Sequence, residues 1–355
     1  MMLYNCRQWI EDLDCTIRNT QELHELAGKK VLITGATGLV CSALADIFIR
    51  YNETNSNPVE IFAAGRSLQR IHSRFSLFAE KDYFHCVAFD ATNPDFDFPV
   101  VMDYIIHGAS ASSPDRLYAE PVETMLGNIF GIHALLELAR KYGRPKLLFI
   151  SSSEVYGRKW NNGPYKESQY GYVDILNVRN AYANGKRAAE AMCISYAQEY
   201  GSEVVIVRPG HVYGPTAKPD DKHICCVWTN SALNHEPIVL KSPGNQLRSY
   251  CYCLDVAAAI IKVLIKGENK HAYNISTADC VISIRQMAEA IAEIADVPVI
   301  TLSATDEEKM QFNPMENAVL DGSALQKIGW KPNFNIKTGF EHTLSILGEM
   351  MKGKA

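Results

Sequence analysis

Residues 31–41 read VLITGATGLVC, in which a short apolar run leads through two glycines into a second apolar segment. The first run predicts a buried strand, and Leu44 and Phe48 lie on the apolar face of a predicted helix beyond the turn. Gly35 permits a tight turn, and Gly38 lets the backbone approach a pyrophosphate at the positive end of that helix. An ordinary loop is the alternative, but the flanking strand and helix supply the context of a dinucleotide-binding turn.

Short β-branched or apolar runs alternate with helical patterns as far as Arg208. The runs are Val31–Thr34, Val59–Ala64, Phe84–Asp90, Tyr104–Gly108, Lys146–Ser151 and Val204–Arg208. This alternation predicts an α/β fold with a Rossmann-type, doubly wound parallel sheet that carries helices on both faces. After Arg208, prolines and glycines punctuate the chain, which predicts a smaller C-terminal α+β lobe that binds substrate.

The expected domain organisation has three parts. They are an N-terminal helical extension at 1–27, an NAD(P)-binding Rossmann domain at 28–208 with later returns near 250–275, and a mainly substrate-binding lobe at 209–355. The extension places Trp9 and Leu13 on one face of an amphipathic helix. We expect this helix to lie outside the main fold.

The composition excludes several classes of protein. The chain has 355 residues, of which 47% are hydrophobic, so it can bury a large core. Its net charge is -5 with no long run of one sign, so we expect neither a nucleic-acid partner nor attraction to a membrane surface. The longest apolar segment, Val256–Ile265, is too short to cross a bilayer, and the acidic N-terminus does not resemble a signal peptide.

The cysteines indicate a reducing compartment. There are 10, and none form a CxxC pair, so we expect a cytoplasmic protein without a disulfide framework. The nearest approach to a metal cluster is formed by His223, Cys225 and Cys226, with Cys251 and Cys253 as further candidates. Adjacent cysteines cannot easily both face one ion, so packing is the favoured interpretation and no metal is expected.

The adenosine end of the predicted cofactor site lacks an acidic residue. The second strand ends in AAGRS at residues 63–67, with no carboxylate to accept hydrogen bonds from a ribose 2′-hydroxyl. Arg66 would suit the 2′-phosphate of NADP, or it stacks on the adenine or points into solvent, and both alternatives stay open. Asp90 is a candidate partner for the adenine amino group. Cys41 occupies the place of a usual third glycine, so the helix and strand must accommodate its side chain.

A tyrosine and a lysine lie four residues apart at Tyr182 and Lys186, hence on one face of a helix. The charges of the lysine and of an oxidised nicotinamide would favour the phenolate of a tyrosine whose ordinary pKa is about 10. Ser152 follows a predicted strand and can hydrogen-bond the reacting oxygen beside Tyr182. The alternatives are that YxxxK occurs by chance and that the serines only cap a turn. The presence of the YxxxK pair, the serine segment and the glycine turn in one chain favours catalysis.

Several motifs resemble the nucleotide-sugar epimerase/dehydratase family of extended short-chain dehydrogenases/reductases, over roughly residues 28–345. They are the glycine turn, SSSEVYG at 151–157, the pair Tyr182/Lys186, RPGHVYGP at 208–215 and DGSALQKIGWKP at 321–332. Within the family the chain most resembles UDP-glucuronate decarboxylases, through Ser152–Gly157, Arg179, Gly185–Arg187, QLRSY at 246–250, HGASASSP at 107–114 and NIFG at 128–131.

The resemblance implies a set of site residues. The catalytic set is Ser152, Ser153, Glu154, Tyr182 and Lys186. The cofactor, NAD or NADP, tightly bound and recycled, would contact Gly35, Thr37, Gly38, Leu39, Val40, Arg66, Asp90, Ala91, Ala109, Ser151, Tyr182, Lys186 and Pro209. The substrate would contact Ser112, Ser113, Arg179, His211 and Arg248.

The implied reaction is oxidation of a nucleotide-linked sugar, expected to be UDP-linked, at C4, followed by loss of CO₂ from a C6 carboxylate and return of the hydride. Ser153 and Glu154 would face the C5–C6 region, and Arg248 would bind the anionic substrate. A 4-epimerase, a 4,6-dehydratase and a non-catalytic NAD(P)-binding regulator remain alternatives. His211 stands where the family usually has asparagine. The resemblance also implies a homodimer and a role in polysaccharide biosynthesis.

Overall fold

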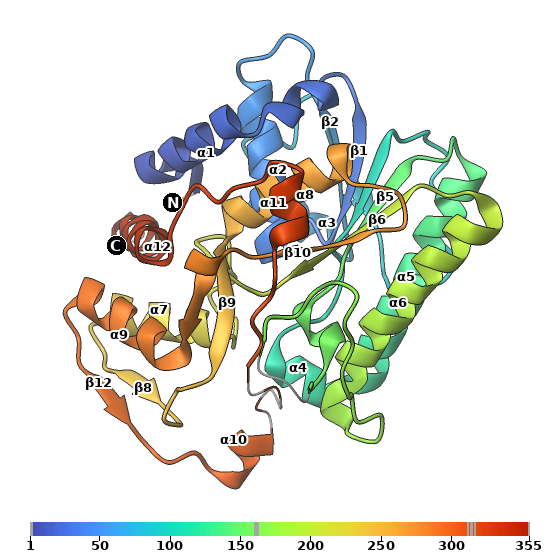
Figure 1. The fold of residues 1–355 in the computed structure, drawn as a ribbon. Coiled ribbons are helices and arrows are strands. Elements are labelled where there is room, and N and C mark those ends of the chain that lie inside the picture. Colours follow the sequence, from blue (N-terminus) through green and yellow to red (C-terminus); the bar gives the residue numbers. More distant parts are fainter. Residues whose placement is uncertain (1–2, 160–162, 311, 313–314, 316, 354–355) are drawn as a thin grey trace.

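The computed structural model describes residues 3–159, 163–310, 312, 315 and 317–353 (Figure 1). Its main sheet has seven strands in the order β10-β6-β5-β4-β1-β2-β3, and every pairing within it is parallel. The strands are β1 Lys30–Thr34, β2 Glu60–Gly65, β3 Phe84–Ala88, β4 Tyr104–His107, β5 Lys146–Ile150, β6 Val204–Pro209 and β10 Ala272–Ile275. The predicted Rossmann-type sheet is therefore confirmed, with a seventh strand that returns from the C-terminal part of the chain.

Helices cover both faces of this sheet because its strands are apolar on both sides. Along β1, Val31 and Ile33 join one hydrophobic cluster, and Leu32 joins the other. One face carries α2 Leu39–Asn52 and α8 Cys253–Lys266, and the opposite face carries α5 Pro121–Lys141 and α6 Ala181–Tyr200 (Figure 1). Short helices α3 Leu68–Arg74 and α4 Pro114–Ala119 complete this part of the molecule.

The smaller lobe contains two small sheets. β11 Val281–Ser283, β9 Leu247–Tyr252 and β7 His211–Tyr213 form a mixed three-stranded sheet, and β8 Ile238–Leu240 pairs in parallel with β12 Val299–Thr301. The helices of this region are α7 Ile224–Leu233, α9 Ile284–Ala295, α10 Asp306–Met310, α11 Ser323–Lys327 and α12 Ile336–Lys352. The 3₁₀ helices of the chain are η1 Leu3–Asn5, η2 Gln21–Leu26, η3 Ser153–Tyr156, η4 Val178–Asn180 and η5 Ala278–Cys280. The predicted α+β lobe is confirmed.

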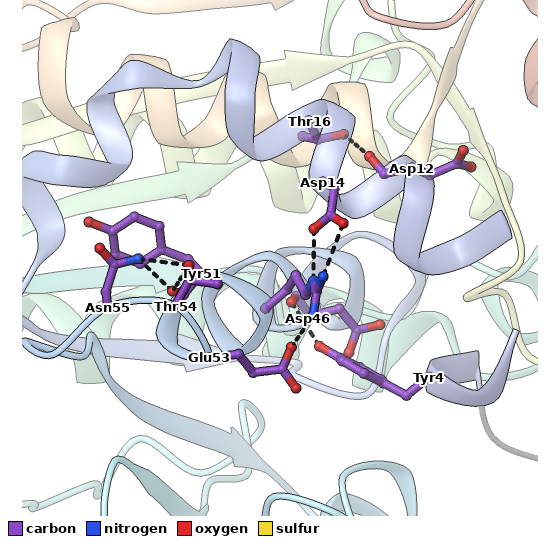
Figure 2. Close-up of polar contacts among 10 residues, drawn as sticks. Tyr4, Asp12, Asp14, Thr16, Asp46, Tyr51, Glu53, Thr54 and Asn55 are labelled. Carbon is purple, nitrogen blue, oxygen red and sulfur yellow. Dashed lines mark hydrogen bonds and ion pairs between the residues drawn. The ribbon is translucent and has the colours of Figure 1, made fainter. Parts of the chain in front are cut away.

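The N-terminal helix α1 (Arg7–Asn19) forms as predicted, but its expected position outside the main fold is wrong. It packs against α2, α8 and α12, and Trp9 and Leu13 are fully buried in the main core. Figure 2 shows Tyr4 and Asp14 directed toward α2, where the Tyr4 hydroxyl donates to the Asp46 carbonyl at 2.8 Å and Asp14 accepts from Arg50 Nε at 2.7 Å. The helix is thus part of the core.

Two surveys of the described residues bear on membranes and metals. Among the described helices, none combines the length and apolar character that a bilayer-spanning segment requires. Within the same part of the chain, histidine, cysteine and acidic side chains form no cluster of three that would ligate a metal ion.

Candidate active site

The glycine turn connects β1 to α2 at the edge of the sheet where the parallel strands end. Gly35 has φ +72°, and a Cβ there would lie 2.8 Å from the backbone nitrogen of Ala109. Gly38 is the N-cap of α2, and its N–H donates to the Gly35 carbonyl at 2.8 Å. Cys41, which stands where the motif usually has its third glycine, is buried against Gly108, and Gly108 has no side chain. The missing Cβ of Gly108 therefore provides the space that Cys41 needs.

The residues at this edge fit a dinucleotide. The turn leaves a backbone cradle that a Cβ on Gly35 would fill, at the positive N-terminus of α2. Ser151 follows β5, and its hydroxyl is buried without a hydrogen-bond partner among the described residues. A buried hydroxyl without a partner, at the same edge of the sheet as the glycine turn, suits a polar ligand. Of the other predicted cofactor residues, Thr37, Leu39 and Val40 lie in the turn and the first turn of α2, and Pro209 ends β6.

A cavity of about 260 Å³ lies at the carboxyl ends of β2 and β3. It is lined by Arg66, Ala88, Phe89, Asp90, Asn93, Asp95 and Phe96. The structure thus brings Arg66 and Asp90 together, and it adds Asp95, which was not predicted. One oxygen of Asp90 accepts from the backbone and hydroxyl of Thr92 at 3.0 and 2.9 Å. Ala91 packs against Gly131 of α5. A Cβ added to Gly131 would lie 2.9 Å from the Cβ of Ala91.

Tyr182 and Lys186 lie on α6 beside the end of β5. Lys186 donates to the Ile150 carbonyl at 2.7 Å, and its Nζ lies 5.8 Å from the centroid of the Tyr182 ring. Ser152 is hydrogen-bonded to Tyr182, and its hydroxyl also accepts from the Glu154 N–H at 3.2 Å. All three predicted groups therefore converge.

Burial sets the protonation of this pair. It raises the pKa of Tyr182 above its ordinary value, Glu154 raises it further, and Ser152 and Arg179 oppose the rise. Burial lowers the pKa of Lys186 to about 7, against the opposing charge of Glu190. The sequence predicted a lowered pKa for Tyr182. In the protein without cofactor, burial and Glu154 outweigh Ser152 and Arg179, so the pKa is raised and the phenol stays protonated.

Glu154 and Arg179 form a two-point ion pair. Both guanidinium Nη atoms donate to the carboxylate at 2.8 Å, and the side chains are only 20% and 7% exposed, respectively. Glu154 lies in η3, and Arg179 lies in η4, which directly precedes α6. The Nε of Arg179 is buried without a partner among the described residues. Ser153, at the start of η3, is also buried.

Two further basic residues, His211 and Arg248, interact electrostatically with this ion pair. His211, on β7, has a buried Nδ1 without a partner in the described part of the chain. Burial, reinforced by the charges of Arg248, His223 and Arg179, lowers the His211 pKa to about 3, so its imidazole is neutral. Arg248, on β9, is buried and donates to the carbonyls of Leu247 and Met315 at 2.9 and 2.7 Å.

The two serines predicted to contact substrate, Ser112 and Ser113, lie at or near the protein surface. Ser112 is exposed, and Ser113 is the N-cap of α4, where its hydroxyl contacts the carboxylate of Asp115. Helix α4 packs against η4, the turn that carries Arg179. These serines are therefore near the ion pair through the packing of two short elements.

Several functional contacts were not anticipated. Asp221 accepts from the His223 ring at 2.6 Å, just before α7. Arg208 donates to Glu190 of α6 at 2.9 and 2.6 Å and to the Tyr156 hydroxyl at 2.9 Å. Arg187 contacts the backbone of η3. Arg187 and Arg208 lie within motifs that carried the family resemblance. That position was the one signal in the sequence that could have indicated these contacts.

Comparisons with known proteins identify the family and the fold. A family model described as "NAD dependent epimerase/dehydratase family" matches residues 31–276. UDP-glucuronic acid decarboxylase 6 of Arabidopsis thaliana is 29% identical over 312 residues, which cover 87% of this chain and 86% of that protein.

Solved structures share the fold. A Bacillus anthracis dTDP-glucose 4,6-dehydratase in complex with NAD has a TM-score of 0.74 at 18% identity, covering 91% of this chain and 98% of that one. A Bacillus cereus UDP-glucuronic acid 4-epimerase in complex with UDP-glucuronic acid and NAD has a TM-score of 0.73 at 20% identity, covering 90% and 99%. The chain belongs to the NAD-dependent epimerase/dehydratase family, whose members are extended short-chain dehydrogenases/reductases that modify nucleotide sugars.

Proposed function

We propose that the chain decarboxylates a nucleotide-linked uronic acid, with UDP-glucuronate as the first candidate, after oxidising it at C4. The observation that carries this proposal is the group formed by the buried Arg179 and Arg248 and the partly buried Glu154 and His211, which lies beside Tyr182. Two guanidinium groups and one carboxylate leave a net positive charge, since His211 is neutral. A buried positive site favours a sugar that carries its own carboxylate over a neutral hexose.

The cofactor would be held along the carboxyl edge of the sheet. Gly35 and the N-terminus of α2 would receive its pyrophosphate, and the cavity of Arg66 and Asp90 its adenosine. Lys186 and Ser151 would hold its nicotinamide end. A bound nicotinamide supplies a place for the hydride removed from C4 and the source from which it returns.

The first half of the reaction uses three side chains. Tyr182 removes the proton of the C4 hydroxyl as the hydride leaves the same carbon, and Ser152 orients that oxygen. Because burial and Glu154 raise the pKa of Tyr182, the cationic groups of the loaded site must lower it before the phenol acts as a base. Arg179 already lowers the pKa of Tyr182, and Lys186, buried and with its own pKa lowered to about 7, lies on the same helix face with its Nζ 5.8 Å from the Tyr182 ring centroid.

The second half breaks the C5–C6 bond. The C4 ketone lies β to the C6 carboxylate, so the electron pair of that bond moves into an enolate as CO₂ leaves. A water molecule protonates C5. The hydride then returns to C4 while Tyr182 gives its proton back to the C4 oxygen, which completes the balance. Arg179 and Arg248 would bind the carboxylate and the developing enolate, and Ser153 and Glu154 would position the C5–C6 region.

A 4-epimerase acting on a uronic-acid nucleotide is the second candidate, because the same positive site would bind its substrate. A similar structure is that of a UDP-glucuronic acid 4-epimerase. A 4,6-dehydratase is less favoured, since Ser153 stands where those enzymes carry an acid. A non-catalytic regulator would not require the contacts among Ser152, Tyr182 and Lys186.

Product analysis tests the proposal. Incubation with UDP-glucuronate should release CO₂ and yield UDP-xylose or a 4-keto pentose, whereas an epimerase should yield a C4-inverted uronate without CO₂. The Tyr182→Phe variant serves as the inactive control. Absence of CO₂ from all uronic-acid nucleotides tried would rule out decarboxylation.

We also propose that NAD is preferred over NADP. The carboxylates of Asp90 and Asp95 share the cavity of Arg66 and would repel a 2′-phosphate. Calorimetric titration of cofactor-stripped protein should give a lower Kd for NAD⁺ than for NADP⁺, and Asp95→Asn should narrow the difference. Tighter binding of NADP⁺ to the unsubstituted protein would contradict the proposal.

Assembly and compartment are proposals of the same kind. We propose a homodimer through the outer faces of α5 and α6, where Ala188 and Met192 are partly exposed, whereas Ala189 belongs to the core. We propose a reducing compartment such as the cytoplasm, because all ten cysteines are free thiols. Polysaccharide biosynthesis is the proposed pathway class.

A further inference from the structure

Arg187 follows Lys186 on α6, and its guanidinium contacts three backbone carbonyls. Nε donates to Val155 at 2.6 Å, and Nη2 donates to Tyr156 at 3.2 Å and to Gly171 at 2.9 Å. Val155 and Tyr156 are the last two residues of η3, where a helix leaves carbonyls without partners of its own. One side chain of α6 therefore satisfies the carboxyl end of η3.

These contacts join the two elements that carry the proposed chemistry. The 3₁₀ helix η3 carries Ser153 and Glu154, and α6 carries Tyr182 and Lys186. Tyr182 and Arg187 lie five positions apart on one helix, a rise of roughly 7.5 Å. Arg187 therefore contributes to the position of η3 relative to Tyr182, together with the ion pair between Glu154 of η3 and Arg179, which lies directly before α6.

The side chain of Tyr156 has separate partners. Its hydroxyl donates to Asn274 at 2.5 Å and accepts from Arg208 at 2.9 Å, so strands β10 and β6 hold it. Loss of the Arg187 guanidinium would leave these contacts intact. Such a variant should fold, but the carboxyl end of η3 would lose its backbone contacts with α6, and the Glu154–Arg179 ion pair would remain.

We propose that Arg187 is a positioning residue, which sets the distance between Glu154 and Tyr182 by holding the backbone of η3 against α6. The inference rests on the proposed two-stage reaction and deepens it. Ser152 is the N-cap of η3 and lies two residues after the end of β5, away from the carbonyls that Arg187 contacts, so hydride removal depends little on Arg187. Glu154 is closer to the Arg187 contacts, so the bond-breaking stage depends on them strongly.

Two variants test this role. Arg187→Met removes all three hydrogen bonds, and Arg187→Lys keeps the charge but loses the fork. With uronate nucleotide added in a single turnover, reduction of the bound cofactor should stay within about threefold of the unsubstituted rate. CO₂ release should fall about a hundredfold in Arg187→Met, the order expected for a displacement of about 1 Å. Arg187→Lys should lie between.

Matched controls separate this role from a general loss of structure. Arg140→Met removes an exposed arginine of α5 that contacts Glu137 and the Tyr200 ring, both outside the proposed site, and it should change neither stage. Equal losses in both stages, or no loss in either, would overturn the positioning role. If Arg187→Met does not fold, Arg187→Lys carries the same comparison.

A crystal structure of the variant supplies a readout independent of turnover. In Arg187→Met, the Glu154 carboxylate should be displaced relative to Tyr182, while Tyr156 remains bonded to Asn274. An unchanged Glu154 position would overturn the inference. If the unsubstituted protein releases no CO₂ from any uronate nucleotide, the proposed function fails, but this structural comparison still decides the role of Arg187.

Discussion

Tyr182 is the residue on which the proposed chemistry depends most. Its replacement by phenylalanine removes the phenolic oxygen that accepts the proton but keeps the buried aromatic ring. We expect the rate of cofactor reduction to fall by roughly 10²- to 10⁴-fold with little change in substrate affinity. Single-turnover absorbance of the reduced nicotinamide measures this loss. The matched control is Tyr196→Phe on the same helix, which loses a hydrogen bond to Glu137, and an equal loss there would contradict the assignment.

His211 should make the folded protein sensitive to acid. Its pKa is lowered to about 3 by burial and by Arg248, His223 and Arg179, against an ordinary value of 6.5. Between these values the unfolded chain binds a proton that the folded chain does not, so stability falls as the pH drops from 6.5 toward 3. In His211→Asn, the free energy of unfolding should fall less over this window, as measured by urea denaturation at several pH values. Identical pH profiles would refute this.

At the residue scale, the pattern of the sequence could predict groups that share one local element. Tyr182 and Lys186 follow from helical spacing, and Gly35 from the demands of the turn. The ion pair of Glu154 with Arg179 joins residues 25 positions apart and requires the folded loop between them, so no local pattern indicates it. The pKa of Tyr182 depends on its burial, which is also a property of the fold.

Helix α1 is the element whose role the structure changes most. Trp9 is fully buried within the core that it shares with α2 and α8. Trp9→Ala should lower the free energy of unfolding by about 3–5 kcal/mol, because it removes a large buried side chain. Chemical denaturation measures this. Arg7→Ala, at a side chain 91% exposed on the same helix, should cost no more than about 0.5 kcal/mol.

The strands and this helix show which elements can be predicted from the sequence. Apolar runs bounded by turns predicted six strands of the main sheet, since a parallel strand buried on both faces needs such a run. Helical spacing predicted α1 as well, but its packing depends on distant partners. Asp12 accepts from the Tyr252 hydroxyl at 3.0 Å, across 240 positions of the chain. A contact of that range leaves no periodic signal.

At the scale of the whole molecule, the candidate site lies where the Rossmann sheet and the smaller lobe meet. The sheet contributes the glycine turn and Ser152, α6 contributes Tyr182 and Lys186, and β7 and β9 contribute His211 and Arg248. The dinucleotide half could be predicted because its motif has a fixed spacing. The substrate half could be inferred only by family resemblance, since its residues come from separate elements.

The central claim is that hydride leaves C4 of the sugar and returns to the same carbon through the group formed by Ser152, Tyr182 and Lys186. Mass spectrometry of the product made from UDP-glucuronate with deuterium at C4 tests it most directly. The account predicts that the released pentose nucleotide retains the deuterium at C4, and that Tyr182→Phe forms no such product. UDP-xylose that carries hydrogen in place of deuterium at C4, or undiminished product from Tyr182→Phe, would contradict it.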